Sequence, residues 1–570
     1  MSEEKTDLLD VQIDGVWHQF PKGTRMIEAC KQAGVEVPHY CYHPKLTSPG
    51  NCRMCLVEMG MPPRPRPGDE PAEPDQDGHL PISWMPRPVI ACANTIGPNM
   101  GIKTTGELTE GCREGVMELL LANHPLDCPI CDQAGECGLQ EFSVEHGKGE
   151  SRFREQKVKK PKNVQVGPRI RLDDERCIMC SRCVRFTEEI ADDPVLGFTD
   201  RGSHTVLSVY PGRELANNYS MNTVDICPVG ALTSNDFRFQ MRVWFMKETN
   251  TIDVNCATGA NITVFARQGK IYRITPRQNN DVNSDWMPDS HRLNFHWVES
   301  EARLTEPMVL DGKNHRTATW SEALTRAADK LSALDGSEIA VIASARMTNE
   351  ELLITSRLVK QLNAGHVDTV PRIEENDGYL IAADRNPNTN GVKLILGLDD
   401  PGSQLDAIRE GIEQGRIKGL LVLQENIVDD AGFSVELLSK LDFLLTSYPL
   451  ANPTADVADV VLPGACWVEK TGTMINVTGR LQRLNKAVDG PGATLEPWEI
   501  VRDLIQAIGG GNGIYSATDL FKQLTEQVSE FSGISWGQIG DLGIPLIETG
   551  ETIPLLEREK ERIAQGLVVG

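Results

Sequence analysis

Twelve cysteine and histidine side chains in the first 230 residues form three consecutive sets of metal ligands. The first set is Cys41, Cys52, Cys55 and Cys92; the second is His124, Cys128, Cys131 and Cys137; the third is Cys177, Cys180, Cys183 and Cys227. Thiolate and imidazole are ligands that iron–sulfur clusters and zinc select. Each set has the four ligands that one iron–sulfur cluster needs. The pattern therefore predicts three metal sites and, where these hold iron, a relay for electrons.

The third set has the most specific spacing. Cys177-Ile-Met-Cys180-Ser-Arg-Cys183 is the C-x2-C-x2-C run of bacterial ferredoxins, and Cys227-Pro228 completes it. A two-cluster ferredoxin would need four more cysteines, at positions that here hold Thr187, Asn217, Ser220 and Thr223. The sequence therefore predicts one four-iron cluster at this set and the loss of a second.

The first set follows the elements expected of a plant-type ferredoxin. Two alternating segments, 8–13 and 16–20, flank Asp14-Gly15, which predicts a β-hairpin. Thr24 is expected to cap a helix that buries Cys30 and ends near Gly34. The gap of ten residues between Cys41 and Cys52 is longer than the usual four. We expect a two-iron site, although four cysteines at these spacings would also suit zinc.

The second set combines one histidine with three cysteines. Thr109 is expected to cap a helix with an apolar stripe that includes Cys112 and Leu119. This helix leads to His124, the nearest donor to a C-x2-C-x5-C run that lacks a fourth ligand. Three cysteines and one histidine also make a structural zinc site, so the spacing leaves iron and zinc both open.

The composition limits the class of protein. The chain has 570 residues and a formal charge of −24, which argues against nucleic acid as a partner. No apolar stretch has the length of a membrane helix, and the charged N-terminus does not resemble a secretory signal. We therefore expect a cytosolic protein whose clustered cysteines bind metal instead of forming disulfides.

The second half of the chain predicts α/β layers around a parallel sheet. Short apolar strands are expected at 341–344, 394–397, 420–423 and 443–446, with helices at 321–334 and 350–362. Only Cys256 and Cys466 remain here, and Cys466 is expected in the core. The glycine-rich stretch 509–513 is expected to be a flexible linker.

Several motifs resemble one family across nearly the whole chain. They are 38–43, Asn51-Cys-Arg-Met-Cys-Leu-Val-Glu58, Asn123-His-Pro-Leu-Asp-Cys-Pro-Ile-Cys-Asp132, 177–186 and 225–232. They resemble the large iron–sulfur subunit (G subunit) of bacterial NADH:quinone oxidoreductase, respiratory complex I. The later half is similar to its molybdopterin oxidoreductase domain, notably at 320–324, 458–464 and 471–476.

The resemblance implies one [2Fe-2S] cluster at the first set and two [4Fe-4S] clusters at the others, with His124 as a cluster ligand. In the family a further four-iron site often opens the later domain. Here its positions hold Asp253, Cys256, Ala260 and Pro288. One thiolate of four cannot hold a cluster, so that site is expected to be empty. No cysteine is placed to bind molybdenum, so no molybdenum cofactor and no independent active site are expected.

The fold class expected is multidomain α+β and α/β. We expect a two-iron ferredoxin-like β-grasp domain at 1–105 with a Pro-rich insertion near 60–88, and a small helical cluster domain at 106–150. A four-iron ferredoxin-like domain at 151–240, a truncated molybdopterin-oxidoreductase-like domain at 241–505 and a C-terminal tail at 506–570 follow.

The resemblance implies an electron-transfer subunit of a proton-translocating NADH:quinone oxidoreductase. Its partners would be the NADH/FMN-binding subunit with its small iron–sulfur partner and a downstream iron–sulfur subunit near quinone. The membrane arm would be reached only indirectly, and the subunit would lie peripherally on the cytoplasmic side of the inner membrane. The alternative is an iron–sulfur/molybdopterin subunit of an NAD-linked formate dehydrogenase or a hydrogenase.

Overall fold

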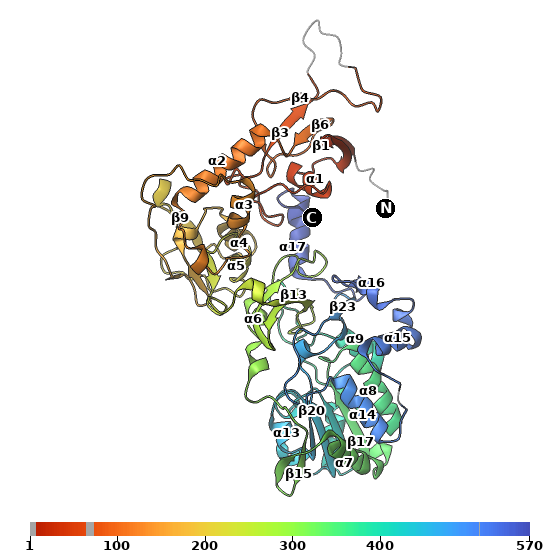
Figure 1. The fold of residues 1–570 in the computed structure, drawn as a ribbon. Helices are drawn as coiled ribbons and strands as arrows, with labels where there is room; N and C mark the ends of the chain where they lie inside the picture. Colours follow the sequence, from red (N-terminus) through yellow and green to blue (C-terminus); the bar gives the residue numbers. More distant parts are fainter. Residues whose placement is uncertain (1–6, 64–72, 512, 570) are drawn as a thin grey trace. The chain divides into compact units, whose positions relative to one another are not determined.

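The computed structural model of the chain describes residues 7–63, 73–511 and 513–569. The chain divides into two compact units, Met1–Trp244 with Glu561–Gly570, and Phe245–Lys560 (Figure 1). Part of the expected Pro-rich insertion, 64–72, lies outside the described residues. None of the helices in the described ranges has the length and apolar character needed to cross a lipid bilayer.

The first unit begins with a mixed sheet in the order β2-β1-β6-β3-β4, and β5 also pairs with β3. Its strands are β1 (Leu8–Ile13), β2 (Val16–Pro21), β3 (Leu56–Met61), β4 (Ser83–Trp84), β5 (Val89–Ile90) and β6 (Met100–Lys103). The predicted hairpin is present: Asp14 and Gly15 both have positive φ, as a tight two-residue turn requires. Helix α1 (Met26–Gln32) buries Cys30, as expected, in the core beneath this sheet.

Both predicted helix caps in this unit are wrong. The cap of α1 is Arg25, and the Thr24 hydroxyl donates instead to the Pro21 carbonyl. Helix α2 (Glu107–Asn123) begins after Gly106, ahead of the expected position, and so Thr109 is buried inside it. The buried face of this helix carries Thr109, Arg113 and Met117 in place of the expected apolar stripe, and Leu119 is 79% exposed.

The segment around the third ligand set has short elements. They are β7 (Val164–Gln165), β8 (Ile170–Leu172), α4 (Arg182–Glu189), β9 (Leu196–Thr199), β10 (Val206–Val209), α5 (Asn222–Asp225) and β11 (Leu232–Ser234). Strands β11, β8 and β7 form one sheet and β9–β10 a hairpin. Helix α3 (Gly138–His146) precedes them and packs on α2. These short elements leave most of the ligands on the loops between them.

The last described residues of the chain belong to the first unit. Arg562 Nη1 donates to the Lys45 carbonyl at 3.1 Å, and the Val569 amide donates to the Pro44 carbonyl at 2.9 Å. Arg25 Nη2 donates to the Leu567 carbonyl at 3.1 Å. This segment is thus hydrogen-bonded to the loop that follows Cys41.

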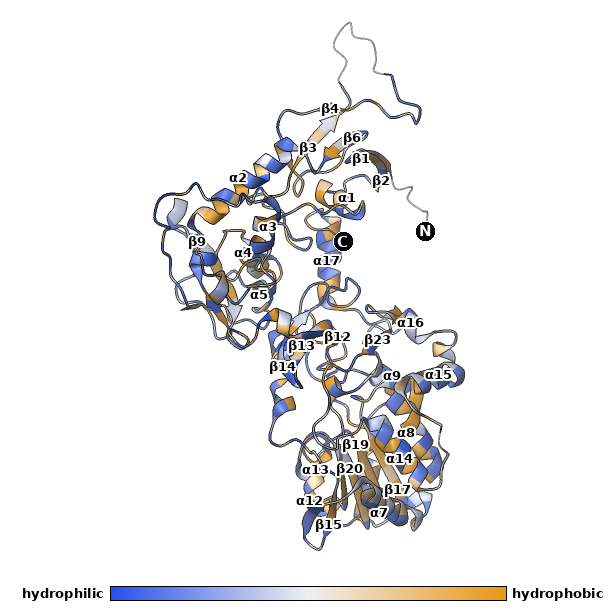
Figure 2. Ribbon diagram, viewed as in Figure 1, coloured by the Kyte–Doolittle hydropathy of each residue, from blue (hydrophilic) through white to orange (hydrophobic). Residues whose placement is uncertain are grey.

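The second unit contains a seven-stranded sheet in the order β16-β15-β21-β20-β19-β17-β18, parallel from β21 to β18. Its strands are β15 (Met308–Asp311), β16 (Asn314–Thr317), β17 (Ile339–Ala343), β18 (His366–Thr369), β19 (Gly419–Leu423), β20 (Phe443–Tyr448) and β21 (Val460–Pro463). The central strands are almost wholly apolar (Figure 2), as strands buried on both faces must be. The predicted parallel α/β sheet is therefore present.

Helices cover this sheet, and one predicted strand is among them. Helices α7 (Trp320–Ser332), α8 (Asn349–Leu362) and α14 (Pro497–Ala507) share one core, and α10 (Leu405–Glu413) belongs to another. The strand expected at 394–397 is wrong, because these residues end helix α9 (Thr389–Leu396) and Gly397 closes it with φ +69°. A four-residue apolar run does not distinguish a strand from a helix turn.

Two smaller sheets complete the second unit. One consists of β12 (Lys247–Ile252), β13 (Asn261–Arg267) and β14 (Lys270–Pro276), the other of β22 (Gly472–Ile475), β23 (Arg480–Leu484) and β24 (Ile544–Pro545). The region expected as a C-terminal tail contains α15 (Ala517–Gln527), α16 (Trp536–Ile539) and α17 (Pro554–Ala564). Phe521 and Phe531 from this region lie in the main core of the unit.

Candidate metal centres

The structure brings the four cysteines of the first set together. Cys41, Cys55 and Cys92 are fully or almost fully buried, and Cys52 is half-buried. The thiol of Cys41 is a hydrogen-bond neighbour of the thiols of Cys52 and Cys92, and Cys92 is in turn a neighbour of Cys55. Gly50, in the same loop just before Cys52, has φ +63°, a conformation that glycine adopts without strain.

The second set meets around one small cavity. His124, Cys128, Cys131 and Cys137 all line it, together with Arg176 and Gly230 from the segments of the third set. The ligands come from three places: the end of α2, the 3₁₀ turn Cys128–Ile130 with the residue after it, and the residue before α3. Burial lowers the pKa of His124 to about 4, so the imidazole is neutral near pH 7 and keeps a lone pair for a metal.

The third set also encloses one cavity. Cys177, Cys180, Cys183 and Cys227 line it, with Arg182 beside them. Burial raises the pKa of Cys180 to about 11 and that of Cys183 well above its usual value. Cys180 and Cys183 are buried, and Cys177 and Cys227 are half-buried. Thiols that resist ionisation need a positively charged centre to become thiolates, and the iron of a cluster would supply one. The donor set and its burial fit a cluster.

Helix α4 connects the third set to the first through hydrogen bonds. It carries Cys183, and its Arg185 donates from Nη2 to the carbonyl of Cys41 at 2.5 Å. Arg182 donates to the carbonyl of Tyr42. Farther along the helix, Glu189 accepts the amide of Thr47 at 2.9 Å. The loop that follows Cys41 in the first set is thus hydrogen-bonded to helix α4, which carries Cys183 of the third set.

The second set lies against the segment of the third set, and Tyr40 lies near both the second set and the first. Cys137 Sγ lies 3.8 Å from the Pro228 carbonyl, next to the ligand Cys227. An added Cβ on Gly230 would lie 2.3 Å from Cys131 Sγ, so the two segments are in direct contact. Tyr40 is buried between the first and second sets: burial raises its pKa, and the thiols of Cys137 and Cys52 raise it further. The three sets therefore form one contiguous group within the first unit.

The residues around Cys256 do not fit a fourth cluster. Asp253 Oδ2 lies 2.6 Å from His291 Nδ1, and its Oδ1 accepts the Asn255 amide at 3.1 Å. Cys256 is buried beside the Leu380 carbonyl at 3.8 Å, and burial raises the pKa of its thiol to about 11. The side chains at 260 and 288, an alanine and a proline, offer no ligand atom. A lone protonated thiol and a carboxylate engaged with histidine cannot hold four irons.

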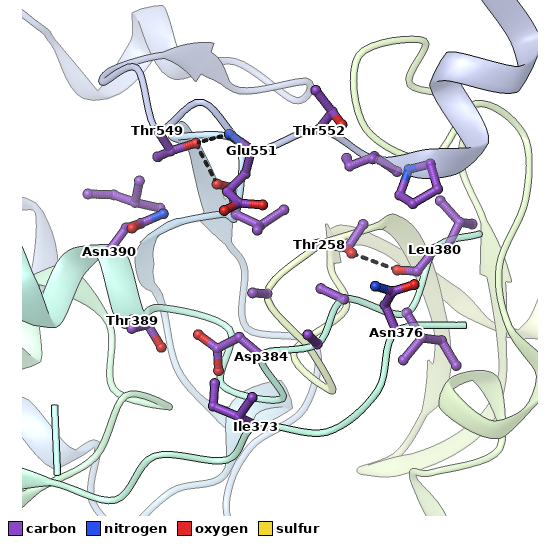
Figure 3. A pocket seen from close by; sticks show the side chains of 18 of the residues that line it. Thr258, Ile373, Asn376, Leu380, Asp384, Thr389, Asn390, Thr549, Glu551 and Thr552 are labelled. Atoms are coloured by element: carbon purple, nitrogen blue, oxygen red, sulfur yellow. Dashed lines mark hydrogen bonds between the residues drawn. The ribbon is translucent and has the colours of Figure 1, made fainter. Parts of the chain in front are cut away.

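A cavity of about 350 Å³ lies in the second unit near Thr258 and Asp384 (Figure 3). The Thr258 hydroxyl donates to the Leu380 carbonyl at 2.6 Å, and the Asp384 carboxylate and Glu551 lie on its walls. The described residues that line this cavity include neither cysteine nor histidine. Its walls therefore offer no thiolate to a metal.

A second cavity of about 520 Å³ is lined by His291 and Cys466, among others. Cys466 is buried in a hydrophobic cluster, as expected, and its sulfur lies 3.8 Å from Arg303 Nη1. Arg303 also makes a bidentate ion pair with Glu469 at 2.8 and 2.7 Å. Burial raises the pKa of the Cys466 thiol, which therefore stays protonated near pH 7.

Sequence reasoning missed the residues that connect the sets. Arg182 and Arg185 belong to the recognised C-x2-C-x2-C segment, but nothing in their spacing indicates that they bind the loop after Cys41. Gly230 closely follows Cys227-Pro228. A glycine at this position was a signal that another segment, here that of Cys131, could approach the backbone closely.

Family models match five segments of the chain. A 2Fe-2S iron-sulfur cluster binding domain matches 6–73, the NADH-ubiquinone oxidoreductase-G iron-sulfur binding region matches 113–152, and the NADH-quinone oxidoreductase subunit 3 ferredoxin-like domain matches 167–233. The NDSU1/NuoG-like 4Fe-4S domain of NADH-ubiquinone oxidoreductase matches 246–296, and molybdopterin oxidoreductase matches 393–507. The chain is thus a multidomain iron–sulfur protein with 2Fe-2S and 4Fe-4S domains and a molybdopterin-oxidoreductase-like domain.

Relatives of known identity match most of the chain. The mitochondrial 78 kDa subunit of NADH-ubiquinone oxidoreductase from Candida albicans is 30% identical over 88% of this chain and 83% of its own length. The G subunit of NADH-quinone oxidoreductase from Rickettsia conorii is 29% identical over 92% of each chain. A chain of the NAD+-reducing [NiFe]-hydrogenase in the H2-reduced state matches 41% of this chain and 91% of its own length at 26% identity, with a TM-score of 0.32. The chain belongs to the family of the large iron–sulfur subunit (G subunit) of NADH-quinone oxidoreductase.

Proposed function

We propose that this chain is the electron-transfer subunit of a respiratory NADH:quinone oxidoreductase. The observation that carries the proposal is the contiguity of three four-ligand sets within one compact unit. The carbonyl of Cys41 accepts a hydrogen bond from the helix that carries Cys183, and Cys137 lies against the residue after Cys227. Such a group suits electron transfer from cluster to cluster, for which the protein supplies ligands, spacing and surroundings.

We infer one [2Fe-2S] cluster at Cys41, Cys52, Cys55 and Cys92, and two [4Fe-4S] clusters at the other sets. The second cluster would be held by His124, Cys128, Cys131 and Cys137, and the third by Cys177, Cys180, Cys183 and Cys227. The clusters supply one-electron redox chemistry when bound. The surrounding residues bury or half-bury all of these ligands except Cys128, which is exposed, and fix which backbone groups face each site.

The proposed partners follow from the family. Electrons would arrive from an NADH- and FMN-binding subunit with its small iron–sulfur partner, and leave towards an iron–sulfur subunit near quinone. The subunit would lie on the cytoplasmic side of the membrane and reach the membrane arm only through those partners. The second unit would support the relay without a cluster or molybdenum of its own, since Asp253, Ala260 and Pro288 replace three cluster ligands.

The test is anaerobic purification of the full chain, iron and sulfide assays, and low-temperature EPR of the reduced protein. One two-iron and two four-iron signals are expected, without stoichiometric molybdenum or tungsten. His124→Ala should alter one four-iron signal alone, whereas His204→Ala, which removes an exposed histidine, should leave all three. A colourless protein that contains zinc would refute the proposed electron relay, and so would stoichiometric bound molybdenum.

A further inference from the structure

Arg182 occupies the space between two of the proposed cluster sites. It is the first residue of α4 and stands between the ligands Cys180 and Cys183 in the sequence. Its Nη2 donates to the Tyr42 carbonyl in the first loop, and its Nη1 donates to the Ile226 carbonyl, next to the ligand Cys227, at 3.3 Å. Both terminal nitrogens are therefore committed to backbone carbonyls of different cluster loops.

The remaining nitrogen of this guanidinium has no protein partner. Arg182 Nε is shielded from solvent and makes no hydrogen bond to any of the described residues. The side chain also lines the cavity enclosed by Cys177, Cys180, Cys183 and Cys227. Leaving a charged N–H donor buried and unsatisfied is costly, so a native structure normally provides an acceptor. The acceptor most suited to this cavity is a sulfur atom of the cluster that the four cysteines would hold.

We propose that Arg182 is a positioning residue shared by two clusters: its Nε–H donates to a sulfur of the third cluster while its Nη2–H fixes the Tyr42 carbonyl of the first. This inference rests on the proposed function. A guanidinium keeps its protons at any physiological pH, so it remains a donor in both oxidation states. A hydrogen bond to sulfur favours the more negatively charged, reduced cluster and raises its reduction potential.

Arg185 provides a matched comparison one turn along the same helix. Arg185 is buried, whereas Arg182 is half-buried, and Arg185 also binds the first loop, through Cys41 and Thr47. Its Nε, however, donates to Ser181 Oγ at 3.3 Å, and it does not line the cavity of the third set. Arg185 therefore shares the structural role of Arg182 without a donor for the cluster.

The first experiment detects the hydrogen bond in the unaltered protein. The full chain is labelled with arginine that carries 15N only in the guanidinium group, because the backbone amide of Arg182 also hydrogen-bonds the Cys180 sulfur. Pulsed EPR then measures nitrogen coupling to the reduced third cluster, which is the four-iron signal unaffected by His124→Ala. We expect a 15N coupling in the wild type and in Arg185→Lys, and its loss in Arg182→Lys. Absence of the coupling in the wild type, or its persistence in Arg182→Lys, overturns the proposal.

The second experiment measures the consequence by redox titration. Arg182→Gln should shift the midpoint of the third cluster to lower potential relative to Arg185→Gln and to Arg213→Gln, which removes an exposed arginine of the same segment. An unchanged midpoint with full cluster content overturns the proposal. If Arg182→Gln loses the third cluster, its midpoint cannot be measured. The proposal is then tested by the first experiment alone, through the 15N coupling in the labelled wild type and its loss in Arg182→Lys. A wild type without four-iron signals would instead refute the proposed function itself.

Discussion

The carboxylate of Asp253 and the ring of His291 lie 2.6 Å apart, and Asp253 stands at the first of the four positions where the resemblance would place ligands of a fourth cluster. Burial alone would raise the pKa of Asp253, but the charge and hydrogen bond of His291 outweigh it and the pKa is lowered. Both side chains are nearly inaccessible, with 3% and 10% of their surfaces exposed. A hydrogen-bonded pair of carboxylate and imidazole thus takes up polar groups of this segment.

Asp253→Ala should destabilise the second unit and leave the clusters intact. Removing the carboxylate leaves the buried ring nitrogen of His291 without its partner, at a cost of about 1 to 3 kcal/mol. The thermal unfolding temperature of the full chain should fall, while EPR of the reduced protein stays unchanged. Glu413→Ala, which breaks an exposed pair with Lys440, should cost less than about 1 kcal/mol. A changed cluster signal in Asp253→Ala would place Asp253 at a metal.

Gly230→Ala should disturb the second cluster from within the segment of the third. The added Cβ would lie 2.3 Å from Cys131 Sγ and 3.1 Å from the Cβ of Gln133, so the ligand loop must move. We expect an altered or lost signal from the second cluster in EPR, with the two-iron signal unchanged. Gly149→Ala is the control, because its Cβ meets no atom within 4 Å. A wild-type spectrum for Gly230→Ala would contradict the contact between the two segments.

Glu350 should make stability of the second unit depend on pH. Burial raises its pKa from 4.5 to about 7, although Thr473 donates to it at 2.7 Å from the amide and 2.8 Å from the hydroxyl. The folded chain therefore binds a proton that the unfolded chain has released. The stabilisation is complete below about pH 4.5 and is lost as the pH rises to about 7, by roughly 3 kcal/mol in all.

The corresponding measurement is thermal unfolding of the wild type and Glu350→Gln between pH 5 and 8. The neutral amide does not titrate, so the wild type should lose stability relative to the variant as the pH rises. Glu322→Gln, at a position 43% exposed, should show no such trend. Parallel profiles for wild type and Glu350→Gln would show that the carboxyl stays ionised in the folded chain.

Phe521→Ala should destabilise the second unit by about 3 to 5 kcal/mol, because the ring is 2% exposed in the main core and the substitution leaves a cavity. Denaturant unfolding of the full chain measures the loss. Tyr515→Ala, at a position 78% exposed in the same region, is the control. Equal stability of the two variants would mean that the region after 505 is an independent tail.

The grouping of the cysteine and histidine side chains, and the elements before them, could be predicted because their signals are local. The hairpin at Asp14-Gly15, the helix at 350–362 and the spacing of Cys177, Cys180 and Cys183 each depend on neighbours in sequence. The strand expected at 394–397 was wrong because a short apolar run fits both a strand and a helix. The caps expected at Thr24 and Thr109 failed because several residues nearby could begin the helix.

The connections between the sets could not be predicted from spacing. Arg185 binds a carbonyl 144 residues earlier in the chain, and Arg182 binds one 140 residues earlier. An arginine within a cysteine motif gives no indication of its distant partner. Likewise the Asp253–His291 pair joins residues 38 apart, and the sequence showed only that cluster ligands were missing.

The hydrogen bonds from the segment after Glu561 to the first loop can form only late in synthesis of the chain. Leu567 meets Arg25 across 542 residues, so the ribosome has translated nearly everything between them before this contact can form. Until then the carbonyls of Pro44 and Lys45, in the loop that follows Cys41, lack the donors that they have in the folded chain. The loop that follows Cys41 can therefore complete its hydrogen bonds only after residues 562–569 have been synthesised.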